Sequence, residues 1–250
     1  MLDPRVKLVE RNFEKVERIV AFASGKGGVG KSLISSATSY ILSLKGYRVA
    51  YLDLDFYGYA GPLLFSIDGQ IKACKEGIEL PISAGVKVMS TGYFLADNPF
   101  PLMGKDKIDY LLDLFSAVKF GEIDLMVIDL PPGLGDELTY TQRIFRDKIN
   151  IVPVTLSSEM SLNVVEKLVK YLKTEEISII GVIVNMFNIF REYEIDEIRA
   201  RLELKILSTL SYHPEVENFR TIKEKLENAP RFKKEIEETV ENLLKELRLD

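Results

Sequence analysis

The chain has 250 residues, with 33 lysines and arginines, 38 aspartates and glutamates, and a formal net charge of −5. The acidic balance argues against a broad nucleic-acid-binding surface. The single cysteine, Cys74, excludes an intrachain disulfide, and no apolar run approaches the ~18–20 residues that span a bilayer. We therefore expect a soluble cytoplasmic protein. Its length suits one domain over residues 1–250, with a polar N-terminal extension over residues 1–17 that shows no core pattern.

Hydrophobic patterns predict that strands and helices alternate along the chain. A short buried strand over residues 18–23 leads into a glycine-rich loop, and helical spacing of apolar residues follows from Leu33 to Leu44. The further strands are expected at residues 47–53, 86–90, 124–130 and about 149–155, 177–185 and 205–211. The further helices are expected at residues 108–118, about 160–173 and 193–203, and 231–250. This alternation predicts an α/β fold with a doubly wound, mostly parallel sheet flanked by helices.

Two regions depart from the regular alternation. Residues 56–85 and the loop over residues 91–104 are rich in glycine and proline, so we expect loops and short elements there and assign them no role.

The C-terminal helix places apolar residues on one face, and its other face carries more glutamate than lysine. Because helices that lie on membranes are typically basic, we expect this one to pack on the domain or on a partner helix.

The glycine-rich loop over residues 24–32 matches a phosphate-binding motif. Gly25, Gly30, Lys31 and Ser32 satisfy G-x-x-x-x-G-K-[ST], in which backbone N–H groups cradle phosphates, the lysine reaches their oxygens and the hydroxyl binds Mg²⁺. A flexible linker is the alternative, but the flanking strand and helix favour the anion site. The residues expected to bind nucleotide here are Gly25, Gly27, Gly28, Val29, Gly30, Lys31, Ser32 and Leu33.

Acidic residues follow two of the predicted strands. Asp129 ends an apolar strand and precedes Pro-Pro-Gly, which is typical of a Walker B acid that holds Mg²⁺ together with Ser32, although it could also be a capping residue. Asp53 and Asp55 are two residues apart, so on a strand they would share a face and reach one metal and one attacking water. A surface acid pair is the alternative for these two.

One further lysine and three longer strings carry a family resemblance. With Lys26 the loop reads G-K-G-G-V-G-K-S, which resembles the deviant Walker A loop of the MinD/ParA/Mrp/nitrogenase-iron-protein ATPases. The strings D-L-D-F-Y-G at residues 53–58, D-L-P-P-G-L-G-D at 129–136 and G-V-I-V-N-M at 181–186 resemble blocks of the Mrp branch, whose members carry iron–sulfur clusters. Leu33 departs from the family, which usually has a second hydroxyl residue there.

The resemblance implies a role for each matching residue. Lys26 would reach across a dimer to the partner's nucleotide, and Lys31 would bind phosphate. Asp53 would lie near Mg²⁺, while Asp55 would orient or deprotonate the attacking water. Two residues complete the implied site: Asn185 would read the adenine ring and Asp136 would sense the γ-phosphate from a switch loop.

The function implied is a slow ATPase that acts as a switch, with ATP and Mg²⁺ as cofactors, an ATP-dependent homodimer and an unidentified protein client. Mrp carriers have a C-x-x-C pair shortly after the N-M strand, but residues 187–193 contain no cysteine. We therefore expect the cluster-carrying function to be lost or reassigned and no iron–sulfur cluster to be bound. Two alternatives stay open: a spatial organiser like MinD or ParA that acts on a membrane or DNA, against which the acidic balance argues, and a cluster scaffold that uses a partner's cysteines.

Overall fold

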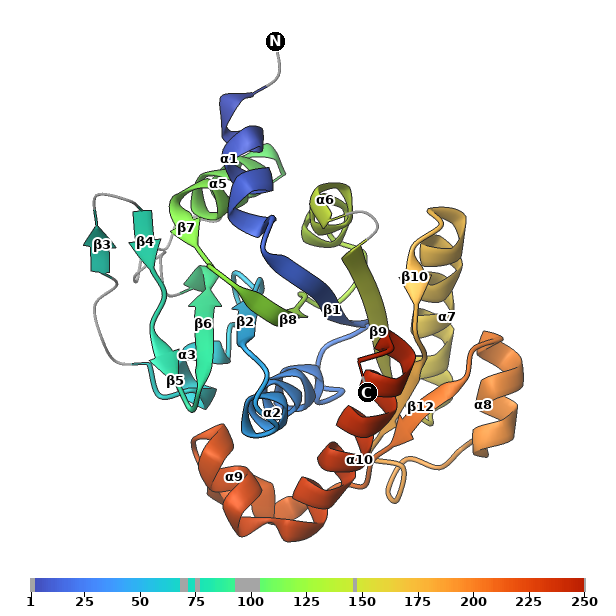
Figure 1. Cartoon of the computed structure of the whole chain (residues 1–250). Helices are drawn as coiled ribbons and strands as arrows, with labels where there is room; N and C mark the ends of the chain where they lie inside the picture. Colours follow the sequence, from blue (N-terminus) through green and yellow to red (C-terminus); the bar gives the residue numbers. More distant parts are fainter. Residues whose placement is uncertain (1–2, 68–71, 75–76, 93–103, 146–147, 250) are drawn as a thin grey trace.

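A central sheet organises the chain, and helices cover both of its faces (Figure 1). The computed structural model describes residues 3–67, 72–74, 77–92, 104–145 and 148–249. Within these residues the sheet has nine strands in the order β12-β11-β9-β1-β8-β2-β6-β5, with β10 paired to β9. All of its pairs are parallel except β5 with β6. The α/β fold that the alternation predicts is therefore confirmed.

The bounds of the elements agree closely with the hydrophobic patterns. The sheet strands are β1 (Val16–Ser24), β2 (Val49–Asp53), β5 (Ile82–Ser83), β6 (Val86–Ser90), β8 (Ile123–Asp129), β9 (Ile149–Leu156), β10 (Ser178–Ile179), β11 (Val182–Asn185) and β12 (Ile206–Thr209). The helices are α1 (Pro4–Phe13), α2 (Lys31–Leu44), α3 (Gly61–Leu64), α5 (Lys105–Ala117), α6 (Asp136–Phe145), α7 (Glu159–Thr174), α8 (Ile195–Leu202), α9 (Ile222–Asn228) and α10 (Pro230–Leu247), with a 3₁₀ turn over Pro214–Asn218. A separate small sheet joins β3 (Lys72–Cys74), β4 (Gly77–Glu79) and β7 (Val118–Lys119).

Two hydrophobic cores lie on the two faces of the central sheet. One is built with α1, α5, α7 and α8, and the other with α2, α9 and α10. Strand β1 is central in the sheet, between β8 and β9, and most of its residues are buried because helices cover both faces. Burial on both faces explains why these strands read as continuous apolar runs and not as alternating ones.

The N-terminal segment contradicts the prediction of a polar extension without a core pattern. Asp3 caps α1 by accepting a hydrogen bond from the Arg5 backbone N–H at 2.9 Å. At the other end of the helix, the ring centroid of Phe13 lies 4.6 Å from that of Phe120 and 4.7 Å from that of Phe145. Helix α1 packs along α5 (Figure 1), so residues 4–13 are part of the fold.

The C-terminal helix packs on the domain, as its charge pattern predicts. Ile236, Val240 and Leu243 are fully buried, and α10 packs against α2 and β12. No helix in the described part of the chain is both long and apolar enough to cross a bilayer.

Other differences from the predictions are local. The strand expected over residues 177–185 is divided into β10 and β11 at Gly181, whose φ of +140° interrupts extended backbone. Helices α6 and α9 were not predicted. Most of the loop expected over residues 91–104 lies outside the described residues.

The sheet topology brings the candidate residues to one edge. Strands β1, β2, β8 and β11 are part of one parallel array, and they end at Ser24, Asp53, Asp129 and Asn185. In the register of the sheet, Asp129 pairs with Phe22 on one side and with Asp53 on the other. Because ligands of open α/β sheets bind at the carboxyl ends of strands, a ligand is expected to bind at this edge.

Candidate functional site

The glycine-rich loop forms a turn that opens directly into a helix. Helix α2 starts at Lys31. The residue before it, Gly30, adopts a left-handed conformation with φ of +85° and, as a glycine, provides no side-chain cap for the helix. A Cβ atom at Gly30 would lie 2.3 Å from Nδ2 of Asn185, so the position has no room for a side chain. The first N–H groups of a helix have no intrahelical acceptors. The N-terminal end of α2, next to the glycine-rich loop, is therefore suited to bind an anion.

A cavity of about 270 Å³ lies against this loop. Its lining joins the loop with the segments that follow β2 and β8, and it consists of Ser24, Lys26, Gly27, Gly28, Val29, Gly30, Lys31, Ser32, Leu33, Asp55, Gly58 and Pro132. The structure thus brings most of the loop residues expected from the sequence to one cavity, together with Asp55. Among the other expected residues whose side chains are described, Gly25, Asp53, Asp129 and Asn185 are not part of the lining.

A buried ion pair lies beside the cavity. The Nζ atom of Lys31 is 2.6 Å from Oδ1 of Asp129, and the side chains are 6% and 1% exposed. The other carboxylate oxygen of Asp129 accepts a hydrogen bond from the Tyr51 hydroxyl at 3.3 Å. The cation and the acid expected at a phosphate site are therefore in direct contact, and the ammonium can exchange a carboxylate oxygen for a phosphate oxygen.

Tyr51 is a site residue that sequence reasoning missed. It is fully buried, and burial raises the pKa of its phenol well above the usual range, with a further contribution from the charge of Asp129. Its position two residues before Asp53 on β2 was the available signal, because residues two apart on a strand share a face. The phenol fixes one oxygen of Asp129.

The two acids at the end of β2 do not share a strand face, contrary to the prediction. Strand β2 ends at Asp53, and Asp55 lies beyond it in a turn where its Oδ1 accepts hydrogen bonds from the N–H groups of Tyr57 at 3.1 Å and Gly58 at 2.8 Å. Only Asp55 faces the cavity. The prediction failed because it assumed that the strand continues through both residues.

Asp53 instead holds protein backbone. Its Oδ2 accepts hydrogen bonds from the N–H groups of Gly61 at 2.8 Å and Ala60 at 3.0 Å, and its Oδ1 accepts one from Asp55 at 3.2 Å. Burial raises the pKa of Asp53 to about 7, and the nearby charge of Asp129 adds to this. These contacts fix the start of α3 and leave Asp53 outside the cavity.

The other expected residues lie around the loop. Asn185 is buried and its Nδ2 donates to the carbonyl oxygen of Val29 at 2.8 Å, so it supports the loop. Lys26 is partly exposed at the cavity, and within the described residues its side chain forms no ion pair. Asp136 is the first residue of α6 and so does not lie within a loop, contrary to the prediction; its side chain lies outside the described part.

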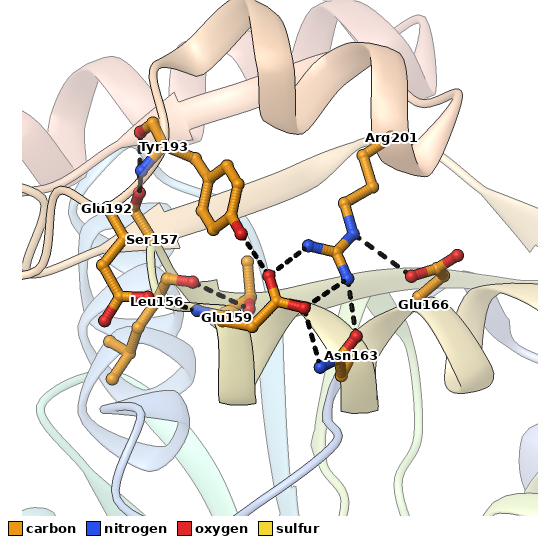
Figure 2. A network of polar contacts seen from close by, with 9 residues as sticks. Leu156, Ser157, Glu159, Asn163, Glu166, Glu192, Tyr193 and Arg201 are labelled. Carbon is orange, nitrogen blue, oxygen red and sulfur yellow. Dashed lines mark hydrogen bonds and ion pairs between the residues drawn. The ribbon is translucent and has the colours of Figure 1, made fainter.

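The segment after β11 is fixed to the start of α7. Figure 2 shows the side chains of Tyr193 and Arg201 converging on Glu159. The Nη1 atom of Arg201 lies 2.8 Å from Glu159, and Ser157 donates to the carbonyl oxygen of Tyr193 at 2.7 Å. The Arg201 guanidinium, helped by the Tyr193 hydroxyl, lowers the pKa of Glu159 to about 2. The polar network thus holds Glu192 and Tyr193, at the end of the stretch 187–193 that contains no cysteine.

Comparisons with known proteins agree with this geometry. The family model described as ParA, NUBPL iron-transfer P-loop NTPase, matches residues 15–247. The chain is 36% identical over 191 residues to the iron-sulfur cluster carrier protein of Methanococcus maripaludis, covering 74% of this chain and 66% of that protein. Among solved structures, it resembles a nucleotide-binding protein of Archaeoglobus fulgidus in complex with ADP, with a TM-score of 0.70, 24% identity, and 85% and 89% of the two chains covered. The cell division ATPase MinD of Pyrococcus furiosus gives a TM-score of 0.68 at 18% identity, with 92% and 99% covered.

The relatives also bear on the expected cofactors. The matched part of the chain spans 59 to 66% of the length of three curated relatives that are all named iron-sulfur cluster carrier proteins. These names do not support our expectation that the cluster-carrying function is lost and that no cluster is bound.

Proposed function

The chain belongs to the ParA family of P-loop NTPases, and on this premise we propose that it binds and hydrolyses Mg-ATP and uses the nucleotide as a switch. The observation that carries the proposal is the Lys31–Asp129 ion pair beside a cavity lined by the glycine-rich loop. This arrangement combines a phosphate-binding cation, helix N–H groups and a carboxylate within one small space.

Each group has a proposed part in the reaction. Lys31 and the N–H groups at the start of α2 bind the phosphates, and Ser32 and Asp129 hold Mg²⁺. This donor set, a hydroxyl and a carboxylate completed by phosphate oxygens and water, suits the ion. When bound, Mg²⁺ neutralises charge on the phosphate oxygens. Asp55, which lines the cavity, orients or deprotonates the attacking water.

Asn185 and Lys26 complete the proposed site. The amide of Asn185 supports the loop through Val29, and its oxygen is suited to accept a hydrogen bond from the amino group of adenine. Lys26 reaches the nucleotide of a second copy of the chain, where it stabilises charge on the transferring phosphoryl group. Hydrolysis is slow, as in other switch proteins, on the order of 10⁻⁴–10⁻² s⁻¹.

Nucleotide binding is tested by isothermal titration with Mg-ATP. We expect the wild-type chain to bind and Lys31→Met to lose measurable binding. Lys45→Met is a matched control, because Lys45 is the C-cap residue of the same helix and lies far from the loop. Equal binding by all three proteins would show that the loop is not the phosphate site.

The role of Lys26 is tested by light scattering on a protein that cannot hydrolyse ATP. We expect Mg-ATP to convert Asp55→Ala from monomer to dimer, and we expect the double variant Asp55→Ala/Lys26→Ala to remain monomeric while it still binds ATP. A nucleotide-bound Asp55→Ala protein whose mass does not change would contradict a role for Lys26 between protomers.

The names of the relatives favour a second candidate function, the handling of iron–sulfur clusters. The sequence contains one cysteine, which does not fit the four-thiolate ligation of such clusters. We propose that the chain handles a cluster as cargo whose remaining thiolates come from another protein. Anaerobic reconstitution with iron and sulfide should give no stable charge-transfer absorbance with the chain alone. A cluster held by the wild-type chain alone and lost in Cys74→Ser would contradict this.

A further inference from the structure

A second ion pair, between a buried glutamate and a partly buried lysine, lies outside the phosphate cavity. The Nζ atom of Lys107, on α5, is 2.7 Å from Oε1 of Glu137, in the first turn of α6. The side chain of Glu137 is 4% exposed and that of Lys107 is 18% exposed. Because a charge buried without its partner is strongly unfavourable, these two side chains are constrained to stay together.

The same ammonium also contacts two aromatic rings from a different part of the chain. Lys107 Nζ lies 5.5 Å from the ring centroid of Phe56 and 5.1 Å from that of Tyr57. Both distances are within the range of cation–π attraction. Phe56 is buried and its ring also packs edge-on against Tyr110 of α5. Lys107 therefore joins three segments: α5, the start of α6 and the residues that directly follow Asp55.

Two of these segments continue into the walls of the phosphate cavity. Residues 55–58, called here the Asp55 segment, line it through Asp55 and Gly58. Residues 129–135, called here the Asp129 segment, run from the last residue of β8 to the start of α6 and line the cavity through Pro132. Lys107 contacts the first directly and the second through Glu137.

Gly135 shows how closely the Asp129 segment is fitted to this ion pair. A Cβ atom at Gly135 would lie 2.5 Å from Oε2 of Glu137, a separation that real side chains do not show. The carboxylate of Glu137 would therefore have to shift if residue 135 carried a side chain. The placement of the carboxylate and the path of the Asp129 segment depend on each other.

We propose that Lys107 and Glu137 are positioning residues that couple the Asp55 segment to the Asp129 segment, so that the two walls of the phosphate cavity move together. The physical reason is that displacement of one segment either breaks the buried pair or carries the other segment with it. The consequence for catalysis rests on the proposed function, in which Asp55 and the Asp129 segment must both face the γ-phosphate at the same time.

The coupling is tested in the nucleotide-free protein by hydrogen exchange. The backbone N–H groups of Tyr57 and Gly58 donate to the Asp55 carboxylate, so their exchange reports how well the Asp55 segment is held. In Glu137→Gln and in Lys107→Met, we expect exchange of these two amides to become about 2- to 30-fold faster, the range that typical coupling energies give.

Matched variants separate coupling from loss of structure. Lys105→Met removes an exposed lysine from the same helix and should leave the two amides unchanged. Lys107→Arg keeps the positive charge and should retain most of the protection. The double variant Lys107→Met/Glu137→Gln leaves no lone buried charge, so it should fold even where a single variant does not, and its exchange should still be fast.

Catalysis provides the second readout. In the same variants we expect kcat for phosphate release to fall while the Kd for ATP stays within about twofold of wild type, because the pair does not touch the nucleotide cavity. The proposal is overturned if exchange of Tyr57 and Gly58 stays within twofold of wild type in every folded variant that lacks the ion pair. Hydrogen exchange is measured without nucleotide. If the chain failed to hydrolyse ATP, the proposed function would be wrong, but the exchange rates would still decide whether the two segments are coupled.

Discussion

Replacing Asp129 with asparagine keeps the shape of the side chain and removes the negative half of the buried pair with Lys31. The ammonium then stays within a site where it is 6% exposed and has lost an ionic partner at 2.6 Å. Breaking a buried pair in this way typically costs about 3–5 kcal/mol. For a domain of this size, 1 kcal/mol corresponds to roughly 2–4 °C in Tm, so Tm should fall by about 6–20 °C.

The assay is urea unfolding at pH 7, with the slope of the transition checked for constancy. Asp124→Asn is the control on the same strand, because Asp124 pairs with the half-exposed Arg48 and such pairs contribute about 0–1 kcal/mol. The double variant Lys31→Met/Asp129→Asn has no lone charge and should recover most of the loss. The reasoning is refuted if Asp129→Asn and Asp124→Asn have the same free energy of unfolding.

Three further predictions concern the loop, the N-terminal helix and the network at α7. Gly30→Ala should weaken ATP binding by about 5- to 150-fold in a calorimetric titration, because the left-handed backbone and the contact with Asn185 together strain the loop by ~1–3 kcal/mol; unchanged affinity would contradict this. Phe13→Ala should lower the free energy of unfolding by about 3–5 kcal/mol in urea, and a loss below 1 kcal/mol would mean that α1 is dispensable. Arg201 holds the folded pKa of Glu159 near 2, below its ordinary 4.5, so this stabilisation is present above pH 4.5 and is lost as the pH falls toward 2. Arg201→Ala should therefore lower Tm more at pH 7 than at pH 3, and an equal difference at both values would refute the ionic origin.

The sequence predicted the sheet and the loop because their signals are local. Apolar runs such as residues 125–128 and the G-x-x-x-x-G-K-S string need no tertiary information to be recognised. The N-terminal helix was missed although Asp3 and Pro4 are a helix start and Val9 and Phe13 are spaced by one turn. Half of its ten residues are polar and only Val9 and Phe13 are buried. That burial depends on α5, which lies about a hundred residues further along the chain.

The candidate site was predicted less completely than the fold. The sequence does not show where β2 ends, and that single boundary decides that Asp53 binds backbone while Asp55 faces the cavity. It also gives no sign that Lys107 and Glu137, thirty residues apart, form a pair, because the contact arises from the packing of α5 and α6. Residue identities at a site can be recognised from motifs, but partners brought together by tertiary packing cannot.

The most direct test of the proposed two-protomer ATPase is the specific activity of the wild-type chain with Mg-ATP, measured as phosphate released per protomer over a hundredfold range of protein concentration. If Lys26 completes the site of a second copy, specific activity rises with concentration to a plateau, and Lys26→Ala stays low throughout. Activity that is independent of concentration, or equal in the two proteins, would contradict catalysis between protomers.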